Sequence, residues 1–237
     1  APILIDEYAP SMPAMVTSLN STTSMIQITI SLMLLGLCLG QLILGPLSDR
    51  FGRRPIVMIG VGLALLASLL CVFAQSADIL LIGRFFQGFG SAAAALTCTA
   101  LIGESFEGDE IARVTGLFIL IYGFVPIASP VIGGHIQAWL GWRSNFIFLL
   151  LVLAVAFLFF WIKMPETVDA SKSEKLHINL LARAYGAVLT NKKYMSAVIG
   201  GMFSWATIIT FSLLGPFLIQ NTLGFSANAY GYLALIA

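Results

Sequence analysis

Long runs without a charged residue constrain this chain more than any other feature of its sequence. Residues 55–77 form an uncharged run of 23, residues 114–142 one of 29, and residues 144–162 one of 19. An α-helix needs roughly 20 mostly apolar residues to cross the hydrocarbon core of a bilayer. The sequence therefore predicts an all-α membrane protein that crosses the bilayer several times.

Two longer runs must each be divided into separate helices. Residues 8–48 are uncharged over 41 positions and residues 194–237 over 44. The polar cluster at 20–24 interrupts the first run, and the turn around Gly224 interrupts the second. The predicted spans are about 1–18, 24–46, 56–75, 79–102, 112–138, 143–163 and 195–219, followed by the start of an eighth. Because the chain begins without Met in one apolar stretch and ends in another, we expect it to be part of a longer protein.

Composition excludes several classes of function. Of the residues, 59% are hydrophobic and 10% are charged, against about 25% charged in soluble domains. The net charge of +1 gives no basic field for nucleic acid. The three cysteines lie singly in separate apolar stretches, without the spacing of metal ligands. With no Ser/His/Asp set and no phosphate-binding loop either, we expect no enzyme, no cofactor, no metal site and no nucleic-acid partner.

The basic residues predict how the chain is oriented. Ten of the twelve Lys and Arg residues fall in the connections after the predicted second, fourth and sixth spans. Since Lys and Arg are enriched in cytoplasmic loops, the N-terminus is predicted to be cytoplasmic, in a bacterial inner membrane. The one long hydrophilic segment, 164–193, is predicted to be a cytoplasmic linker that contains an amphipathic surface helix. It would separate a six-helix bundle, 1–163, from the first one or two helices of a second bundle, 194–237.

The connection between the second and third predicted spans has a distinctive sequence. It reads Gly45-Pro46-Leu47-Ser48-Asp49-Arg50-Phe51-Gly52-Arg53-Arg54-Pro55. We expect Gly45 and Pro46 to close the second span, Gly52 to permit a sharp reversal, and Pro55 to fit the first turn of the third span. Asp49 would lie near that helix N-terminus, where a carboxylate is favoured. A plain positively charged loop would explain the arginines but not the aspartate with its glycines.

This segment resembles the signature loop of the major facilitator superfamily at every defining position. The resemblance implies that family's fold: an N-terminal six-helix bundle built from two three-helix inverted repeats, followed by a second bundle. It also implies a gate latch that contacts the other bundle, formed by Gly45, Asp49, Arg50, Gly52, Arg53 and Arg54.

The fourth predicted span contains an arginine followed by Gln-Gly, similar to the family's fourth-span motif. Arg84, Gln87 and Gly88 lie at helical spacing on one face. An arginine within a span is costly and normally faces a polar cavity, which makes Arg84 a functional candidate. The alternative is an arginine that snorkels from the helix end to the bilayer surface.

The fifth predicted span resembles the family's antiporter motif, which bends the helix and lets a neighbour pack closely. It carries Pro126, Pro130, Gly133 and Gly134, and two prolines four residues apart distort a helix. Ser129 stands where the family usually has glycine, so a purely structural kink remains an alternative.

The first predicted span narrows the resemblance further. Asp6-x-Tyr8-x-Pro10-x-x-Pro13 keeps the spacing of the bicyclomycin/chloramphenicol-type drug:proton antiporters. In a continuous helix Asp6, Pro10 and Pro13 share one face, whereas Glu7, which replaces an apolar residue of the motif, points about 100° away.

These residues suggest a mechanism. A carboxylate inside a membrane is costly when charged, so it can take up a proton and release it as its hydration changes. We expect protonation of Asp6 to compete with its pairing to Arg84 or to a cationic substrate, with Glu7 as the second candidate. A cavity is predicted to be lined by Tyr8, Met12, Gln87, Tyr122 and Trp205, although ordinary helix packing would also explain these side chains.

The function predicted from the sequence is export of drugs or small amphiphiles in exchange for protons. The partners would be the small-molecule substrate, protons and the lipid bilayer, and we expect a monomer. The alternatives are a facilitator or symporter for a metabolite, sugar or siderophore, and a receptor that does not transport. A complete gating loop argues against the receptor, since a bundle that does not move has no use for a latch.

Overall fold

The chain forms a set of long helices, as the sequence predicts. The computed structural model describes residues 3–164 and 178–235, and within these ranges the regular structure is entirely helical. Six helices are long and apolar enough to cross a membrane. They are α3 (Thr23–Phe51), α4 (Arg53–Val72), α5 (Ala77–Ser105), α6 (Asp109–Leu140), α7 (Trp142–Lys163), and α9 (Lys192–Phe217) with its continuation η3 (Leu218–Thr222).

The first predicted span is broken instead of continuous. It consists of α1 (Ile3–Asp6), the short η1 (Ala9–Ser11) and α2 (Met12–Ser18), with bends at Glu7 and Tyr8. A proline lies in the first positions of both η1 and α2, where its missing N–H is tolerated. The prediction that Asp6, Pro10 and Pro13 share one helix face is therefore wrong, because each proline begins a new helical segment.

The second predicted span runs further than expected. Gly45 and Pro46 do not close it, because α3 continues through both to Phe51 and ends only at Gly52, whose φ is 100°. Pro46 cannot donate to the carbonyl of Leu42, four residues earlier. That carbonyl instead accepts a hydrogen bond from the Tyr185 hydroxyl at 3.4 Å. An external donor thus replaces the one that the proline removes.

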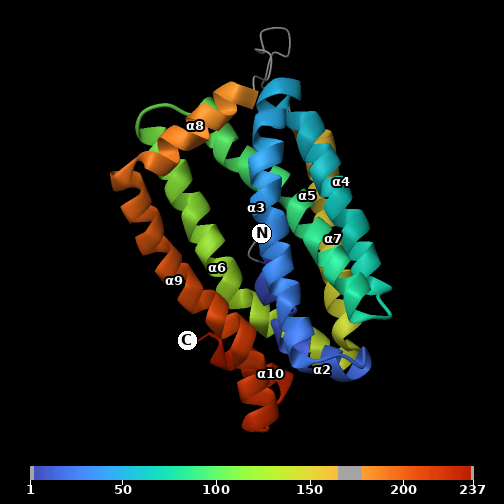
Figure 1. Cartoon of the computed structure of the whole chain (residues 1–237). Coiled ribbons are helices and arrows are strands. Elements are labelled where there is room, and N and C mark those ends of the chain that lie inside the picture. The colour runs from blue at the N-terminus through green and yellow to red at the C-terminus, as the bar shows by residue number, and fades with distance from the viewer. Residues whose placement is uncertain (1–2, 165–177, 236–237) are drawn as a thin grey trace.

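The two ends of the bundle differ in charge. We call the end with Arg50, Arg53 and Arg54 the basic end, and the end with the α2–α3 and α4–α5 connections the opposite end. Figure 1 shows α8 (Ile178–Thr190) lying across the basic end, at the top of the view, whereas α10 (Ala227–Leu233) lies with α2 at the opposite end. Of the predicted linker 164–193, residues 165–177 lie outside the described residues and α8 forms much of the rest; the boundaries of the linker stay a prediction.

Helices α3 and α5 approach closely because glycines face each other's backbone. A Cβ at Gly36 would collide with the carbonyl of Phe85, one at Gly40 would lie 2.5 Å from the carbonyl oxygen of Phe89, and one at Gly88 would collide with the carbonyl of Met33. Small residues permit such contacts between membrane helices, where dispersion and interhelical hydrogen bonds drive association.

The contacts of α6 and α9 are concentrated in the second part of each helix. In α6 the buried residues are Ser129, Pro130, Gly133 and Gly134, and in α9 burial begins at Ser212. The side chains of 192–208 in α9 are mostly exposed. In Figure 1, α9 accordingly converges on the bundle toward the opposite end and diverges from it toward the basic end.

Replacing Gly88 by alanine should weaken the α3–α5 contact. The added methyl group meets backbone that cannot rotate away, so we expect the variant to lose about 1–3 kcal/mol of stability. The control is Gly103→Ala on the same helix, where a Cβ would meet nothing within 4 Å. The thermal unfolding midpoint of the purified protein in detergent measures both. Equal midpoints for the two variants would contradict the packing described here.

Candidate functional site

Arg84 lies at the centre of a buried polar network. Its side chain is 0% exposed. Nη2 donates to the carbonyl of Leu4 at 2.6 Å and contacts Met33 Sδ at 2.9 Å, and Nη1 donates to Gln87 Oε1. The guanidinium carbon lies 4.2 Å from the centre of the Tyr8 ring. Arg84 thus points into the bundle, and the snorkelling alternative is wrong.

The network continues from α5 into α4. Gln87 Nε2 donates to Ser68 Oγ at 2.6 Å, and Ser68 Oγ donates to the carbonyl of Ala64 at 2.8 Å. Gln87 therefore holds Arg84 with its oxygen and Ser68 with its nitrogen. Ser68 was not among the predicted site residues, because a single serine in an apolar run gives no sequence signal.

Tyr8 joins the network to α3 and α7. Its hydroxyl forms a 2.9 Å hydrogen bond with Thr29 Oγ1, and its ring lies 5.6 Å from that of Phe146. Together with the cation–π contact to Arg84, these interactions hold the Tyr8 side chain from three directions. Tyr8 and Met12 are both 0% exposed.

Asp6 contacts a helix that lies far away in the sequence. Its side chain is 8% exposed, and Oδ1 accepts a hydrogen bond from Ser212 Oγ of α9 at 2.9 Å. The predicted pairing with Arg84 is absent from this structure, and within the described residues Arg84 forms no ion pair. The carboxylate of Asp6 thus links the broken first segment to α9.

Glu7 has different surroundings from its neighbour. The residue is 0% exposed, and neither carboxylate oxygen has a hydrogen-bond partner. Its backbone carbonyl packs against Gly133 of α6, where a Cβ would collide with it. The guanidinium of Arg84 lies over the ring of the next residue, Tyr8, but forms no hydrogen bond with the Glu7 carboxylate.

The glycine pair in α6 provides two close approaches. Gly133 faces the backbone of Glu7, and a Cβ at Gly134 would lie 2.6 Å from the carbonyl oxygen of Ala227 in α10. Asn145 of α7 supports the first contact, because its Nδ2 donates to the Gly133 carbonyl at 3.3 Å and to Ser11 Oγ. Helix α6 stays continuous through Pro126 and Pro130.

Further polar contacts close the opposite end. Gln220 Nε2 donates to the carbonyl of Pro10 at 2.8 Å, and Gln27 Nε2 donates to that of Leu213 at 3.0 Å. His135 Nδ1 lies 2.8 Å from the Val131 carbonyl, and its Nε2 lies 3.3 Å from the hydroxyl of Tyr232 in α10. Except for the contact between His135 and Val131 within α6, these pairs join residues distant in sequence, so the sequence analysis could not identify them.

The gating loop is stabilised by an ion-pair cluster at the basic end. Arg53 Nε lies 3.0 and 3.1 Å from the two carboxylate oxygens of Glu104, and Arg53 Nη2 lies 3.3 Å from Asp49. Arg54 Nη2 donates to the carbonyl of Trp161 at 2.8 Å. The guanidinium carbon of Arg50 lies 4.9 Å from the centre of the neighbouring Phe51 ring. The sequence analysis missed Glu104, which lies in the last turn of α5.

The predicted cavity residues do not gather in one enclosed cavity. Tyr8, Met12 and Gln87 are fully buried, whereas Tyr122 is 37% and Trp205 49% exposed.

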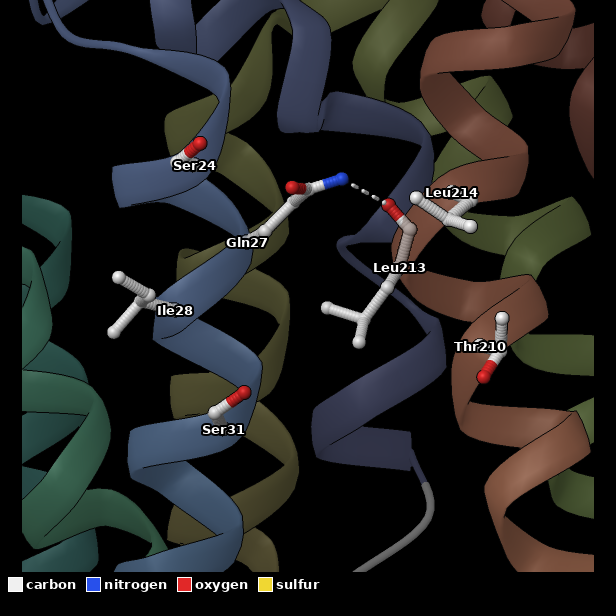
Figure 2. A pocket seen from close by; sticks show the side chains of 7 residues that line it. All are labelled: Ser24, Gln27, Ile28, Ser31, Thr210, Leu213 and Leu214. Atoms are coloured by element: carbon white, nitrogen blue, oxygen red, sulfur yellow. Dashed lines mark hydrogen bonds between the residues drawn. The ribbon is translucent and has the colours of Figure 1, made fainter.

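An open groove of about 320 Å³ lies between α3 and α9. Figure 2 shows it crossed by the hydrogen bond from Gln27 to Leu213. None of the predicted site residues lines it; its lining consists of Ser24, Gln27, Ile28, Ser31, Thr210, Leu213 and Leu214.

Comparison with known families agrees with this architecture. The family model described as Major Facilitator Superfamily matches residues 5–237. The chain belongs to this superfamily. It is 30% identical over 233 residues to the bicyclomycin resistance protein homolog of Haemophilus influenzae, covering 98% of this chain and 58% of that protein. It is 28% identical over 232 residues to the multidrug resistance protein MdtL of Escherichia coli O139:H28, covering 97% of this chain and 58% of that protein.

Solved structures of the superfamily share the fold. The human organic anion transporter MFSD10 (TETRAN) matches with a TM-score of 0.56 at 16% identity, over 97% of this chain and 59% of the other. A D-xylose-proton symporter matches with a TM-score of 0.57 at 19% identity, over 99% and 63%. The chain thus spans somewhat more than half the length of its relatives. Their names indicate transporters and not enzymes, and the predicted major facilitator fold and multi-pass topology are confirmed.

Replacing Gln87 by an apolar residue should lower the stability of the protein, because the Arg84 network depends on the Gln87 side chain. Gln87→Leu leaves a buried guanidinium and the Ser68 hydroxyl without a partner, which should cost about 1–3 kcal/mol. Thr99→Val on the same helix is the control, because Thr99 is exposed and bonds only to carbonyls of its own helix. Thermal unfolding of both variants in detergent measures the difference. A midpoint for Gln87→Leu no lower than that of the control would contradict the network.

Proposed function

We propose that this chain is part of an exporter of drugs or small amphiphiles that exchanges them for protons. The observation that carries the proposal is the buried Asp6 carboxylate, whose oxygen accepts a hydrogen bond from Ser212 across to α9. A group that binds a proton and also links two parts of the protein can couple protonation to their relative movement. The names of the relatives, which refer to bicyclomycin and multidrug resistance, support drugs as the substrate class.

The arrangement of α6 and α9 supports alternating access. The two helices are held at the opposite end by the contacts of Ser212, Gln220 and Gly134, and their side chains toward the basic end are largely exposed. The predicted orientation makes the basic end cytoplasmic, so the structure represents a state closed to the outside. In this state Asp6 would exchange its proton with the cytoplasm. Rocking of the bundles would break the Ser212 contact and expose the carboxylate to the outer side.

Two aromatic side chains fit an apolar or cationic substrate. Tyr122 of α6 and Trp205 of α9 are partly exposed, and aromatic rings bind both apolar groups and organic cations. We propose that the substrate enters between these helices and displaces the proton from Asp6.

The gating loop would control this movement from the basic end. Asp49, Arg53 and Glu104 form an ion-pair cluster that fixes the ends of α3, α4 and α5 relative to one another. We propose that this cluster is the fixed platform on which the second bundle closes. The proposal also includes the division of the chain into a six-helix unit 1–163, a linker 164–193 and a second unit 194–237. It places the protein in a bacterial inner membrane as a monomer with a cytoplasmic N-terminus.

Asp6→Asn should abolish proton-driven export while leaving the protein folded, because asparagine keeps the shape and the Ser212 contact but cannot bind a proton. The measurement is transport of a fluorescent lipophilic cation into inverted membrane vesicles with an imposed pH gradient. Asp78→Asn is the control, since Asp78 is an exposed carboxylate in the first turn of α5.

Wild-type transport by Asp6→Asn would refute the coupling role. Movement of the substrate in the same direction as the protons would favour the symporter alternative. A panel of metabolites and sugars is then the next test.

A further inference from the structure

Glu7 is a buried carboxylate that the mechanism above leaves without a role. It is 0% exposed, and both of its oxygens lack hydrogen-bond partners. A charged carboxylate without hydrogen bonds in a low-dielectric interior costs several kcal/mol. A protonated carboxyl group tolerates the same place far better. In the arrangement described here, the geometry therefore favours a neutral Glu7.

A potential partner for the ionised form lies nearby. The guanidinium of Arg84 lies 4.2 Å from the centre of the ring of Tyr8, the residue after Glu7, and its Nε has no hydrogen-bond partner although the other guanidinium nitrogens do. An N–H donor and two acceptor oxygens are thus left unpaired in the same interior. A small displacement that brings them together would form a charge-assisted hydrogen bond, which is among the strongest that proteins make.

The position of Glu7 allows such a displacement. Glu7 and Tyr8 form the bend between α1 and η1, and they are not part of a helix. The Glu7 backbone is in contact with Gly133 of α6, so movement of α6 relative to the bundle acts directly on this bend. Broken segments of this kind bind ions and substrates in other transporters.

The other groups around Glu7 are already engaged. Asp6 is bonded to Ser212, Tyr8 to Thr29, and α6 presents the backbone of Gly133. Asp6 is held by Ser212 and forms no ion pair with Arg84, so it does not take up the unpaired Nε of that guanidinium.

We propose that Glu7 is a second proton-binding site, separate from Asp6. In the alternate arrangement of the bundles, Arg84 Nε would hold the ionised form of Glu7. Its role in transport rests on the proposed proton exchange, to which it would add a second proton. Proton binding itself can be detected without any transport.

Infrared difference spectroscopy of the purified protein in lipid, taken between acidic and alkaline pH, tests this directly. A carboxyl C=O without a hydrogen-bond partner absorbs at higher frequency than one that accepts a bond. Besides the bands of the exposed carboxyl groups, we expect the wild type to show two bands from its buried carboxyl groups, Asp6 and Glu7. Glu7→Gln should remove the band at higher frequency, and Asp6→Asn should remove the other.

Glu7→Met provides a second variant, because an unbranched apolar side chain fits a buried site without needing a partner. It should unfold at or above the wild-type temperature and lack the same band. The proton count released by an alkaline pH step should fall by one in both Glu7 variants.

A high-frequency band that persists in folded Glu7→Gln and Glu7→Met would overturn the proposal. If the band is assigned to Glu7 but the wild type shows no proton-driven transport, the proposed function fails and the proton site stands. If transport is proton-driven but neither Glu7 variant loses a band, the proposed proton site at Glu7 fails and the proposed function stands.

Discussion

The buried charge of Arg84 is the constraint on which the rest of this structure depends. A guanidinium without solvent is costly unless it finds polar partners, and the chain supplies a backbone carbonyl, an amide oxygen, a sulfur and an aromatic face for all of it except Nε. These partners come from the first segment, α3 and α5. The charge therefore fixes where the first segment lies in the bundle. The break at Glu7 and Tyr8 places the Leu4 carbonyl and the Tyr8 ring against the guanidinium of Arg84.

This arrangement separates two carboxylates that are adjacent in the sequence. Asp6 faces α9 and accepts a bond from Ser212, whereas Glu7 lies against α6. Because α6 and α9 are held mainly at the opposite end, any rocking between them changes the surroundings of both groups. In the proposed mechanism this geometry would link protonation to conformation, which is the requirement for exchanging a proton for a substrate.

Much of the fold could be predicted because membrane helices leave a clear signal in the sequence. Uncharged runs located the six long helices within a few residues at most ends, and Gly52 was recognised as the reversal before α4. The break in the first segment was missed because its prolines were treated as positions on one helix, although each begins a new one. Arg84, Asp6 and Glu7 were identified because charges are rare in apolar runs. Ser212, Ser68 and Thr29, which bond to Asp6, Gln87 and Tyr8, are ordinary polar residues distant in sequence from these partners, so only the three-dimensional structure could reveal them.

The central claim is that carboxyl protonation in this interior selects which end of the protein is closed. Distances between spin labels measure this most directly, with one pair at the basic end, on Ala112 and Ser196, and one at the opposite end, on Ala138 and Thr222. All four positions are exposed. Neutral carboxyls favour the arrangement described here, so at acidic pH the opposite-end distance should be short and the basic-end distance long. At alkaline pH the distance at the opposite end should lengthen and the distance at the basic end should shorten. Distances that do not change with pH, or that change in the same direction at both ends, would contradict the account.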